Sequence, residues 1–175
     1  ATSYSYNDPL NRLRETDYPD GGKTTIDYNG QSSITTSQLI TPSLAKTTVA
    51  SMDGMFHVVS TQLTSDAPCM DTTDTIYDGE GRVYKQSNPH CSSETVNWTQ
   101  NNYDALGRTT SVQETDGSTA TSSYSGNATT TADEAGNQRT STTDALGRLI
   151  EVDEPGTLGT SATPATGSFT ITGSE

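Results

Sequence analysis

Short polar segments separated by turn residues make up most of this chain. No stretch repeats apolar residues with the i, i+3, i+4, i+7 spacing of an amphipathic helix for three turns. Gly and Pro recur at short intervals, and the segments between them are rich in Thr and Ser, which suit a strand with a solvated face. Reading from turn to turn predicts about fourteen strands of roughly five to seven residues. We therefore expect an all-β antiparallel meander with little or no helix.

The pattern Asp-x-x-Gly-Arg marks the clearest turns. Its residues are Asp78, Gly81 and Arg82, then Asp104, Gly107 and Arg108, then Asp144, Gly147 and Arg148. Asp is favoured at the first position of a type I turn, and a left-handed Gly at the fourth position completes a turn followed by a bulge. Each motif therefore predicts a β-hairpin.

Three further segments vary this motif. Two of them keep its ends, with Asp8, Asn11 and Arg12 in one and with Asp133, Gly136 and Asn137 in the other. Asn tolerates the left-handed conformation that Gly supplies elsewhere. The third segment begins at Asp53 and is degenerate, because a positive φ at Phe56 would be costly.

A longer repeat is superimposed on the turns. Asp8 and Asp104, and likewise Tyr28 and Tyr124, are separated by the same interval, which indicates an internal duplication. In both copies an Asp-Gly pair, at residues 20–21 and 116–117, predicts a two-residue hairpin turn. The copies then diverge, and we expect a longer loop over 36–44.

These features predict the following domain organisation. A repeat sheet over 1–155 contains duplicated parts at about 4–62 and 99–154, placed around a middle hairpin at 69–91. Residues 156–175 form a linker and a terminal strand, which could begin another β module or pair with a neighbouring subunit.

Composition excludes several classes of protein. Only 29% of the residues are hydrophobic and 6% are aromatic, so a large core is not expected. The net charge of -13 argues against binding to nucleic acid or anionic lipid. Apolar runs are far shorter than the roughly 20 residues that span a bilayer, so membrane insertion is not expected.

The three motifs resemble the signature of the YD-repeat, or RHS-repeat, family, which is close to Tyr-Asp-x-x-Gly-Arg-Leu. The matching segments are 77–83, 103–108 and 144–149, and the resemblance extends from Tyr4 to about Pro155. Members are large secreted or cell-surface bacterial proteins whose repeats wind into a spiral β-sheet shell that can enclose a toxin. The resemblance implies that the Asp and Arg of each motif hold turns to adjacent strands.

Cys69 and Cys91 lie at nearly equal distances along the chain from the turn that begins at Asp78. Residues placed in this way face each other across a hairpin, so we predict a disulfide bond and an oxidising compartment. A metal site is not expected, because His57 and His90 have no further ligands at suitable spacing.

The remaining candidate chemistry is weaker. Asn97 and Asn127 begin glycan-acceptor sequences, which also arise by chance in a Thr-rich chain. Acidic pairs at 133–134 and 153–154 could bind calcium, but the ligand spacing of known loops is absent, which favours solvated surface acids. No carboxylate pair stands out as catalytic, so we expect no enzyme activity and no cofactor.

Three functions remain open at this point. The first is a non-catalytic extracellular repeat protein that forms a β-sheet wall, ribbon or filament by pairing with adjacent repeats or with other subunits. The second is a segment of an RHS shell around a toxin. The third is a carbohydrate-binding adhesin, in which Trp98 would stack on a sugar. All three imply a location outside a bacterial cell, and the sequence itself reads as an excerpt of a longer chain.

Overall fold

The computed structural model describes residues 1–155 and 166–170. The chain divides into two compact units, Ala1–Trp98 and Thr99–Glu175, which are described separately below. Both units are built from antiparallel strands, and the described residues contain no helix, so the predicted all-β meander is confirmed. It follows that no helix in these residues is long and apolar enough to cross a membrane.

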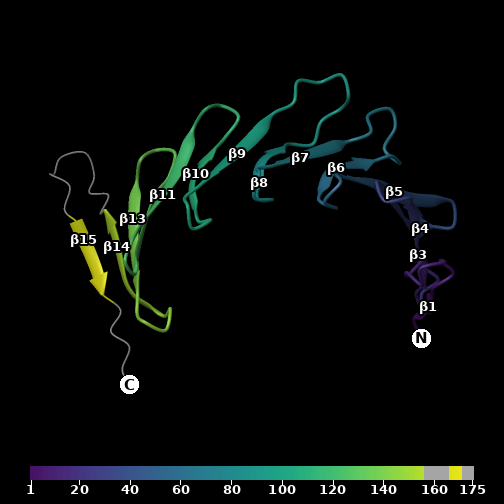
Figure 1. Ribbon diagram of the computed structural model, residues 1–175, viewed down its shortest axis with the longest axis horizontal. Helices are drawn as coiled ribbons and strands as arrows, with labels where there is room; N and C mark the ends of the chain where they lie inside the picture. Colours follow the sequence, from purple (N-terminus) through teal and green to yellow (C-terminus); the bar gives the residue numbers. More distant parts are fainter. Residues whose placement is uncertain (156–165, 171–175) are drawn as a thin grey trace. The chain divides into compact units, whose positions relative to one another are not determined.

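The first unit is an antiparallel meander in which each strand pairs with the strand before and after it in sequence (Figure 1). Its strands are β1 (Ser3–Ser5), β2 (Glu15–Asp17), β3 (Lys23–Asn29), β4 (Ser33–Thr41), β5 (Leu44–Met52), β6 (Val58–Leu63), β7 (Thr72–Tyr77) and β8 (Val83–Ser87). The longest pairings join β3, β4 and β5, where Thr36 lies opposite both Ile26 and Thr48.

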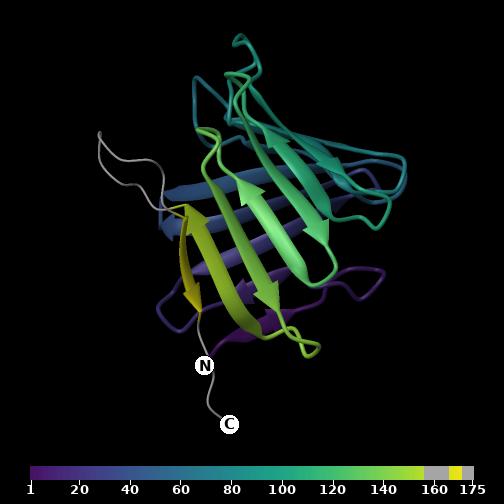
Figure 2. The same cartoon turned by 90° about the vertical axis from the view of Figure 1, so that its left-hand side faces the viewer.

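The second unit repeats this arrangement. Its strands are β9 (Trp98–Tyr103), β10 (Thr109–Gln113), β11 (Thr119–Ser125), β12 (Ala128–Ala132), β13 (Gln138–Thr143), β14 (Leu149–Pro155) and β15 (Thr166–Thr170). Figure 2 shows these strands, coloured green to yellow, side by side with alternating directions. The predicted terminal strand is thus present, and β15 pairs with β14 of the same chain. The predicted linker at 156–165 and the end of the chain at 171–175 lie outside the described residues.

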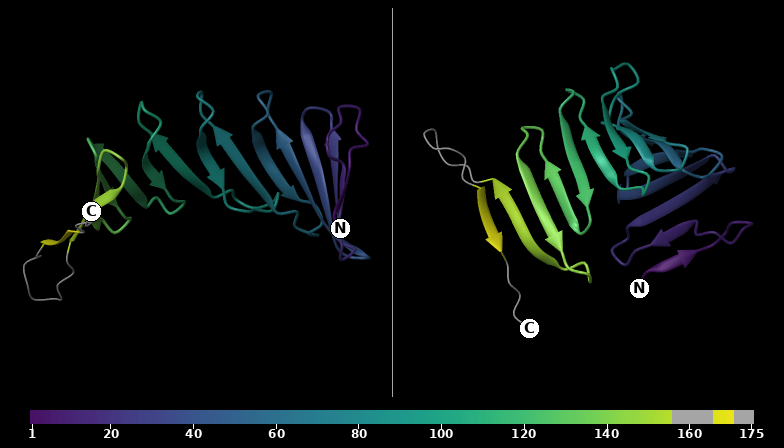
Figure 3. Two further views of the ribbon diagram at one scale, coloured as in Figure 1. Left: turned by 90° about the horizontal axis from the view of Figure 1, so that it is seen from below. Right: turned by 60° about the vertical axis from the view of Figure 1, so that its left-hand side comes forward.

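Because the strands alternate in direction, successive turns fall at opposite ends of the strands (Figure 3). In the first unit, the turns after β1, β3, β5 and β7 share one end. In the second unit, the turns after β9, β11 and β13 share one end. We call each such set of turns a motif row, because every Asp-x-x-Gly-Arg turn belongs to one.

Neither unit encloses a hydrophobic core within the part of the chain described. No hydrophobic residue there is buried, and the only residues there that are buried as a whole are Thr16 and Ser87, at 7% and 5% exposure. A large core was not expected from the composition. Each unit is therefore a single layer that depends on backbone ladders and cross-strand side-chain pairs for its stability.

The prediction of a longer loop over 36–44 is wrong. These residues belong mostly to the long hairpin formed by β4 and β5, which leaves only Pro42 and Ser43 between the strands. The Thr-rich composition explains the difference, since β-branched side chains favour paired strands, and Ser37 Oγ lies 2.9 Å from Thr47 Oγ1 across the pair.

Candidate functional site: repeated turns, tyrosine locks and a disulfide

The Asp-x-x-Gly-Arg turn has the geometry that its residues require. In the turn that begins at Asp104, the backbone N–H of Gly107 donates to Asp104 O at 3.0 Å, and that of Asp104 donates to Arg108 O at 2.9 Å. Gly107 has a φ of 79°, in the left-handed region that glycine adopts without strain. These bonds define a type I turn followed by a bulge.

The aspartate side chain completes this turn. Asp104 Oδ1 accepts hydrogen bonds from the backbone N–H groups of Leu106 and Arg108, both at 2.9 Å. Its Oδ2 atom accepts a bond from Arg108 Nε at 2.7 Å. Asp78 with Arg82 and Asp144 with Arg148 form the same set of bonds. One carboxylate thus satisfies three donors of its own turn.

The two variants reach the same result with other groups. Asp133 accepts bonds from the backbone N–H of Asn137 and from its side-chain amide, both at 2.8 Å, so the amide stands where the guanidinium stands elsewhere. In the first turn, Asp8 is almost completely buried, with 1% of its side chain exposed, and it pairs with Arg12 at 2.8 Å. Asn11 supplies the positive φ of that turn, 55°.

The degenerate segment at Asp53 also forms the turn, with Phe56 at the position where a positive φ was expected to be costly. Phe56 has a φ of 66°, and its N–H donates to Asp53 O at 3.1 Å. The Asp53 carboxylate accepts bonds from the N–H groups of Met55 and His57 at 2.8 and 2.9 Å. His57 Nδ1 lies 3.1 Å from Asp53 Oδ2, so an imidazole takes the place of the arginine.

The two Asp-Gly pairs do not form two-residue turns, so this prediction is wrong. The N–H of Gly117 donates to Glu114 O, and that of Glu114 donates to Ser118 O, which is the bond pattern of the motif turns. Tyr18 and Gly22 close the other turn in the same way. Asp and Gly therefore occupy the third and fourth turn positions, because Gly117 supplies the left-handed residue that precedes the bulge, with a φ of 87°.

A tyrosine from a later strand fastens two of the motif turns, and the sequence alone did not reveal it. The guanidinium of Arg12 lies over the ring of Tyr28, with its central carbon 3.9 Å from the ring centroid, and Tyr28 Oη donates to Leu13 O at 3.1 Å. In the second unit, Arg108 lies 4.1 Å from the centroid of Tyr124, whose Oη donates to Thr109 O at 2.8 Å.

We call this combination a tyrosine lock: the side chain that follows the left-handed turn residue packs on a tyrosine ring, and the tyrosine hydroxyl donates to the carbonyl of the next residue. In a third example, His57 takes the place of the arginine. The rings of His57 and Tyr77 are stacked with centroids 4.6 Å apart, and Tyr77 Oη donates to Val58 O at 3.0 Å. The common spacing from Arg12 to Tyr28 and from Arg108 to Tyr124 is the sequence signal that could have predicted the first two.

The turn carboxylates have lowered pKa values. For Asp78, Asp104 and Asp144, the main cause is the hydrogen bond from the backbone N–H of the motif arginine, and the guanidinium lowers the pKa further. For Asp8 and Asp133, the main cause of the lowered pKa is the side-chain bond from Arg12 or Asn137. These interactions favour the charged carboxylate and outweigh its partial desolvation.

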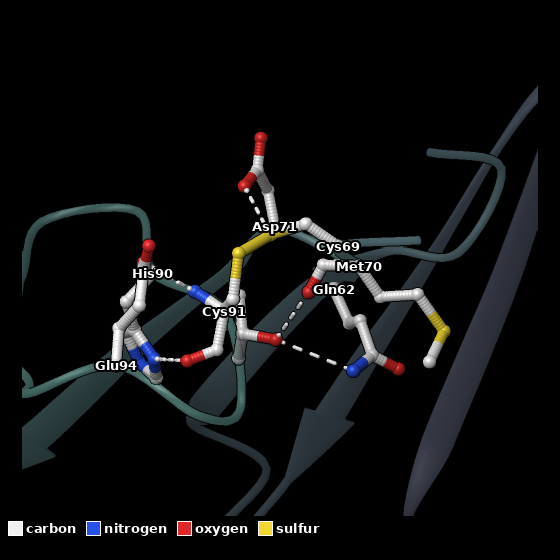
Figure 4. The surroundings of a disulfide bond; sticks show 8 residues. Gln62, Cys69, Met70, Asp71, His90, Cys91 and Glu94 are labelled. Atoms are coloured by element: carbon white, nitrogen blue, oxygen red, sulfur yellow. Dashed lines mark hydrogen bonds between the residues drawn. A yellow bond between two sulfur atoms is a disulfide. The ribbon is translucent and has the colours of Figure 1, made fainter. Parts of the chain in front are cut away.

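The predicted disulfide bond between Cys69 and Cys91 is present (Figure 4). Their Cα atoms are 5.2 Å apart, within the usual range for this bond. The disulfide joins the segment before β7 to the segment after β8. Next to it, Thr72 and His90 exchange backbone hydrogen bonds of 2.9 and 3.0 Å. The open end of the middle hairpin is therefore closed by a covalent bond and by an isolated β-bridge.

The other candidate residues are distributed over several turns and strands. Asn97 and Asn127 are both exposed, and the amide of Asn127 donates to Thr143 O. Both acidic pairs are exposed: residues 133–134 lie in the turn after β12, and residues 153–154 lie on β14. Trp98 is half-buried at the start of β9.

No family model and no curated protein matches the sequence. One chain in the crystal structure titled TcdB2-TccC3-Cdc42 has a similar fold, with a TM-score of 0.55 and 14% sequence identity. The match covers 88% of this chain and 10% of that chain. The likeness shows a shared fold. This chain spans about a tenth of the length of the matched chain.

Proposed function

We propose that this chain is a non-catalytic structural segment of an extracellular bacterial β-sheet wall of the YD/RHS type. The observation that carries the proposal is the combination of a single-layer meander with repeated motif turns, each of which is held by the aspartate that opens it. No hydrophobic residue is buried among those described, so the stability of each unit comes from bonds between neighbouring strands. Such a sheet can be lengthened by further repeats without any change in its interior.

The disulfide supports a location outside the cytosol, because such bonds persist in oxidising compartments. The likeness to a small part of a much longer chain supports a role as one segment of a larger sheet. The wall can continue in two ways: through more repeats of the same polypeptide, or through other subunits that pair with an exposed edge strand such as β1.

Electron microscopy of the purified chain, combined with sedimentation, tests pairing between subunits. We expect filaments or ribbons whose length increases with protein concentration. The double variant Ser3→Lys/Ser5→Lys places two charges on β1 and should abolish them, since charged edge strands resist pairing. The matched control Ser92→Lys/Ser93→Lys carries the same charges on an exposed loop and should assemble normally.

A toxin-enclosing shell is the second candidate, and the fold shared with a chain of the TcdB2-TccC3 complex favours it. Hollow closed particles, formed when the chain is expressed together with its flanking repeats, would support the shell. Isolated monomers of this chain that do not assemble, together with flanking repeats that extend into neither a ribbon nor a closed particle, would contradict both forms of the wall. Specific binding of a sugar that is lost in Trp98→Ala would instead favour an adhesin.

A further inference from the structure

Three potential metal ligands meet at the open end of the middle hairpin. The sulfur atoms of Cys69 and Cys91 and a carboxylate oxygen of Asp71 all lie within 4.8 Å of one another, and all three residues are half-buried. Asp71 Oδ1 is 3.2 Å from Cys69 Sγ (Figure 4). In the oxidised protein the sulfurs are bonded to each other, so the cluster is available only after reduction.

Other bonds hold the two segments together independently of the disulfide. Thr72 and His90 exchange two backbone hydrogen bonds, and His90 Nε2 lies 3.1 Å from Asp74 Oδ2. The N–H of Cys91 donates to Glu94 Oε2 at 2.9 Å, which orders the backbone on one side of the cluster. These contacts contain no sulfur, so reduction leaves both thiols close to the Asp71 carboxylate.

We propose that the reduced protein binds one zinc ion through Cys69, Cys91 and Asp71. A thiol or phosphine reductant supplies two electrons, and two protons are taken up as the disulfide becomes two thiols. Binding of Zn²⁺ then releases both thiol protons and forms two Zn–S bonds and one Zn–O bond. Two thiolates and one carboxylate are ligands that zinc accepts in tetrahedral geometry, and water takes the fourth position.

The ion and the disulfide would close the same loop in two redox states. A chain synthesised in a reducing compartment would have the end of its middle hairpin closed by zinc. Thiol–disulfide exchange with an oxidised dithiol reagent, which accepts the two electrons and becomes two thiolates, would then form the Cys69–Cys91 bond and release the ion. This inference concerns only residues 69–94 and does not depend on the proposed wall.

Cobalt and zinc titrations of the full chain test the site. After reduction with a phosphine under anaerobic conditions, we expect one equivalent of Co²⁺ to bind with a thiolate charge-transfer band, and Zn²⁺ to displace it. Cys69→Ser and Cys91→Ser should each abolish the band. Asp71→Asn should weaken Zn²⁺ affinity by roughly tenfold or more, because loss of a direct ligand should cost at least as much as loss of an outer-shell partner. Asp66→Asn removes an exposed acid from the same loop and should change nothing.

Several results would overturn the proposal. One is the absence of stoichiometric metal binding by the reduced chain, whether or not circular dichroism shows that its strands persist. Another is equal binding by the wild-type chain and by either serine variant. Equal affinities of Asp71→Asn and Asp66→Asn would remove the carboxylate from the site and contradict the three-ligand arrangement.

Discussion

The aspartate that opens each motif turn is the residue on which the turn depends. Its carboxylate accepts two backbone N–H groups and a side-chain donor, whether that donor is the guanidinium of Arg108, the amide of Asn137 or the imidazole of His57. The donor varies while the acceptor does not. An ionised carboxylate is the better acceptor, and this explains why the pKa of every such aspartate is lowered.

Acid should therefore destabilise the protein. In the folded chain the pKa of each of these carboxyl groups lies below the usual value for an unfolded aspartate, about 3.9. Their contribution to stability is therefore present above that pH and is lost as the pH falls through the lowered values. We expect the urea midpoint, followed by circular dichroism, to be level near neutral pH and to decrease steeply below about pH 3.9. Asp104→Asn/Asp144→Asn should have a lower midpoint at neutral pH and a shallower acid decrease. A midpoint that does not change down to pH 2.5 would contradict this assignment.

Phe56 is the residue that fits its turn least well. Its φ of 66° is costly for a bulky side chain, and 61% of that side chain is exposed, so little burial offsets the cost. Phe56→Asn should raise the free energy of unfolding by about 1 kcal/mol, because asparagine tolerates this conformation and already occupies it at Asn11. Met55→Asn is the matched control, since Met55 is equally exposed in the same turn but has no positive φ. An equal gain in both variants would show that exposure, and not backbone strain, is responsible.

At the scale of the element, the hairpins were predictable and the locks between them were not. The turn after β9 depends on five consecutive residues, so its motif could be read directly from the sequence. The tyrosine lock joins the Arg108 turn to Tyr124 on β11, two strands further on, and its recognition required the register of those strands. The Asp-Gly turns were misread for a related reason: the first bond of the turn comes from Glu114, which lies outside the dipeptide.

Removal of one hydroxyl group tests the lock. Tyr124→Phe keeps the ring against Arg108 but loses the bond from Oη to Thr109 O, and we expect the free energy of unfolding to decrease by about 1 kcal/mol. Tyr18→Phe removes a hydroxyl from an exposed ring that forms no such bond within the described residues, and it should have little effect. The comparison is made by urea denaturation, and equal losses in the two variants would count against the lock.

The disulfide is the strongest single constraint on the middle hairpin. The two cysteines are 22 residues apart, and closing a loop of this size contributes about 3 kcal/mol in the chain-entropy model. Compared with the oxidised wild-type chain, and with no metal present, Cys69→Ser/Cys91→Ser should lower the free energy of unfolding by about that amount. Hydrogen exchange should show that loss of protection is concentrated in β7 and β8. Uniform loss over the first unit would mean that the hairpin and its neighbours unfold together.

At the scale of the whole molecule, repulsion between the excess acidic side chains opposes folding, and no large hydrophobic core offsets it. The chain has 22 acidic and 9 basic residues, and the described part buries no hydrophobic side chain. Mutual repulsion between the acids therefore weighs more heavily than in a protein with a large core. The low hydrophobic content made the absence of a deep core predictable, and the second unit begins at Thr99, where the second part of the internal duplication begins in the sequence.

Salt should stabilise the chain for this reason. Raising the sodium chloride concentration from about 0.05 to 0.5 M screens the repulsion, and the midpoint of thermal unfolding should rise. Ion pairs such as Lys23 with Glu15 are weakened by the same screening, but the excess of acids makes the net effect positive. A midpoint that falls with salt would show that the ion pairs dominate. Sodium sulfate at equal ionic strength would separate screening from preferential exclusion.

The alternation of turns imposes a parity rule on the evolution of this chain. Two Asp-x-x-Gly-Arg turns of one unit lie in the same motif row only if an even number of strands separates them. Gain or loss of a single strand would move every later turn of that unit to the opposite end and separate Arg108 from Tyr124 if it fell between them. Insertions and deletions should therefore be tolerated only as complete hairpins. A designed chain could be lengthened or shortened only by two strands at a time.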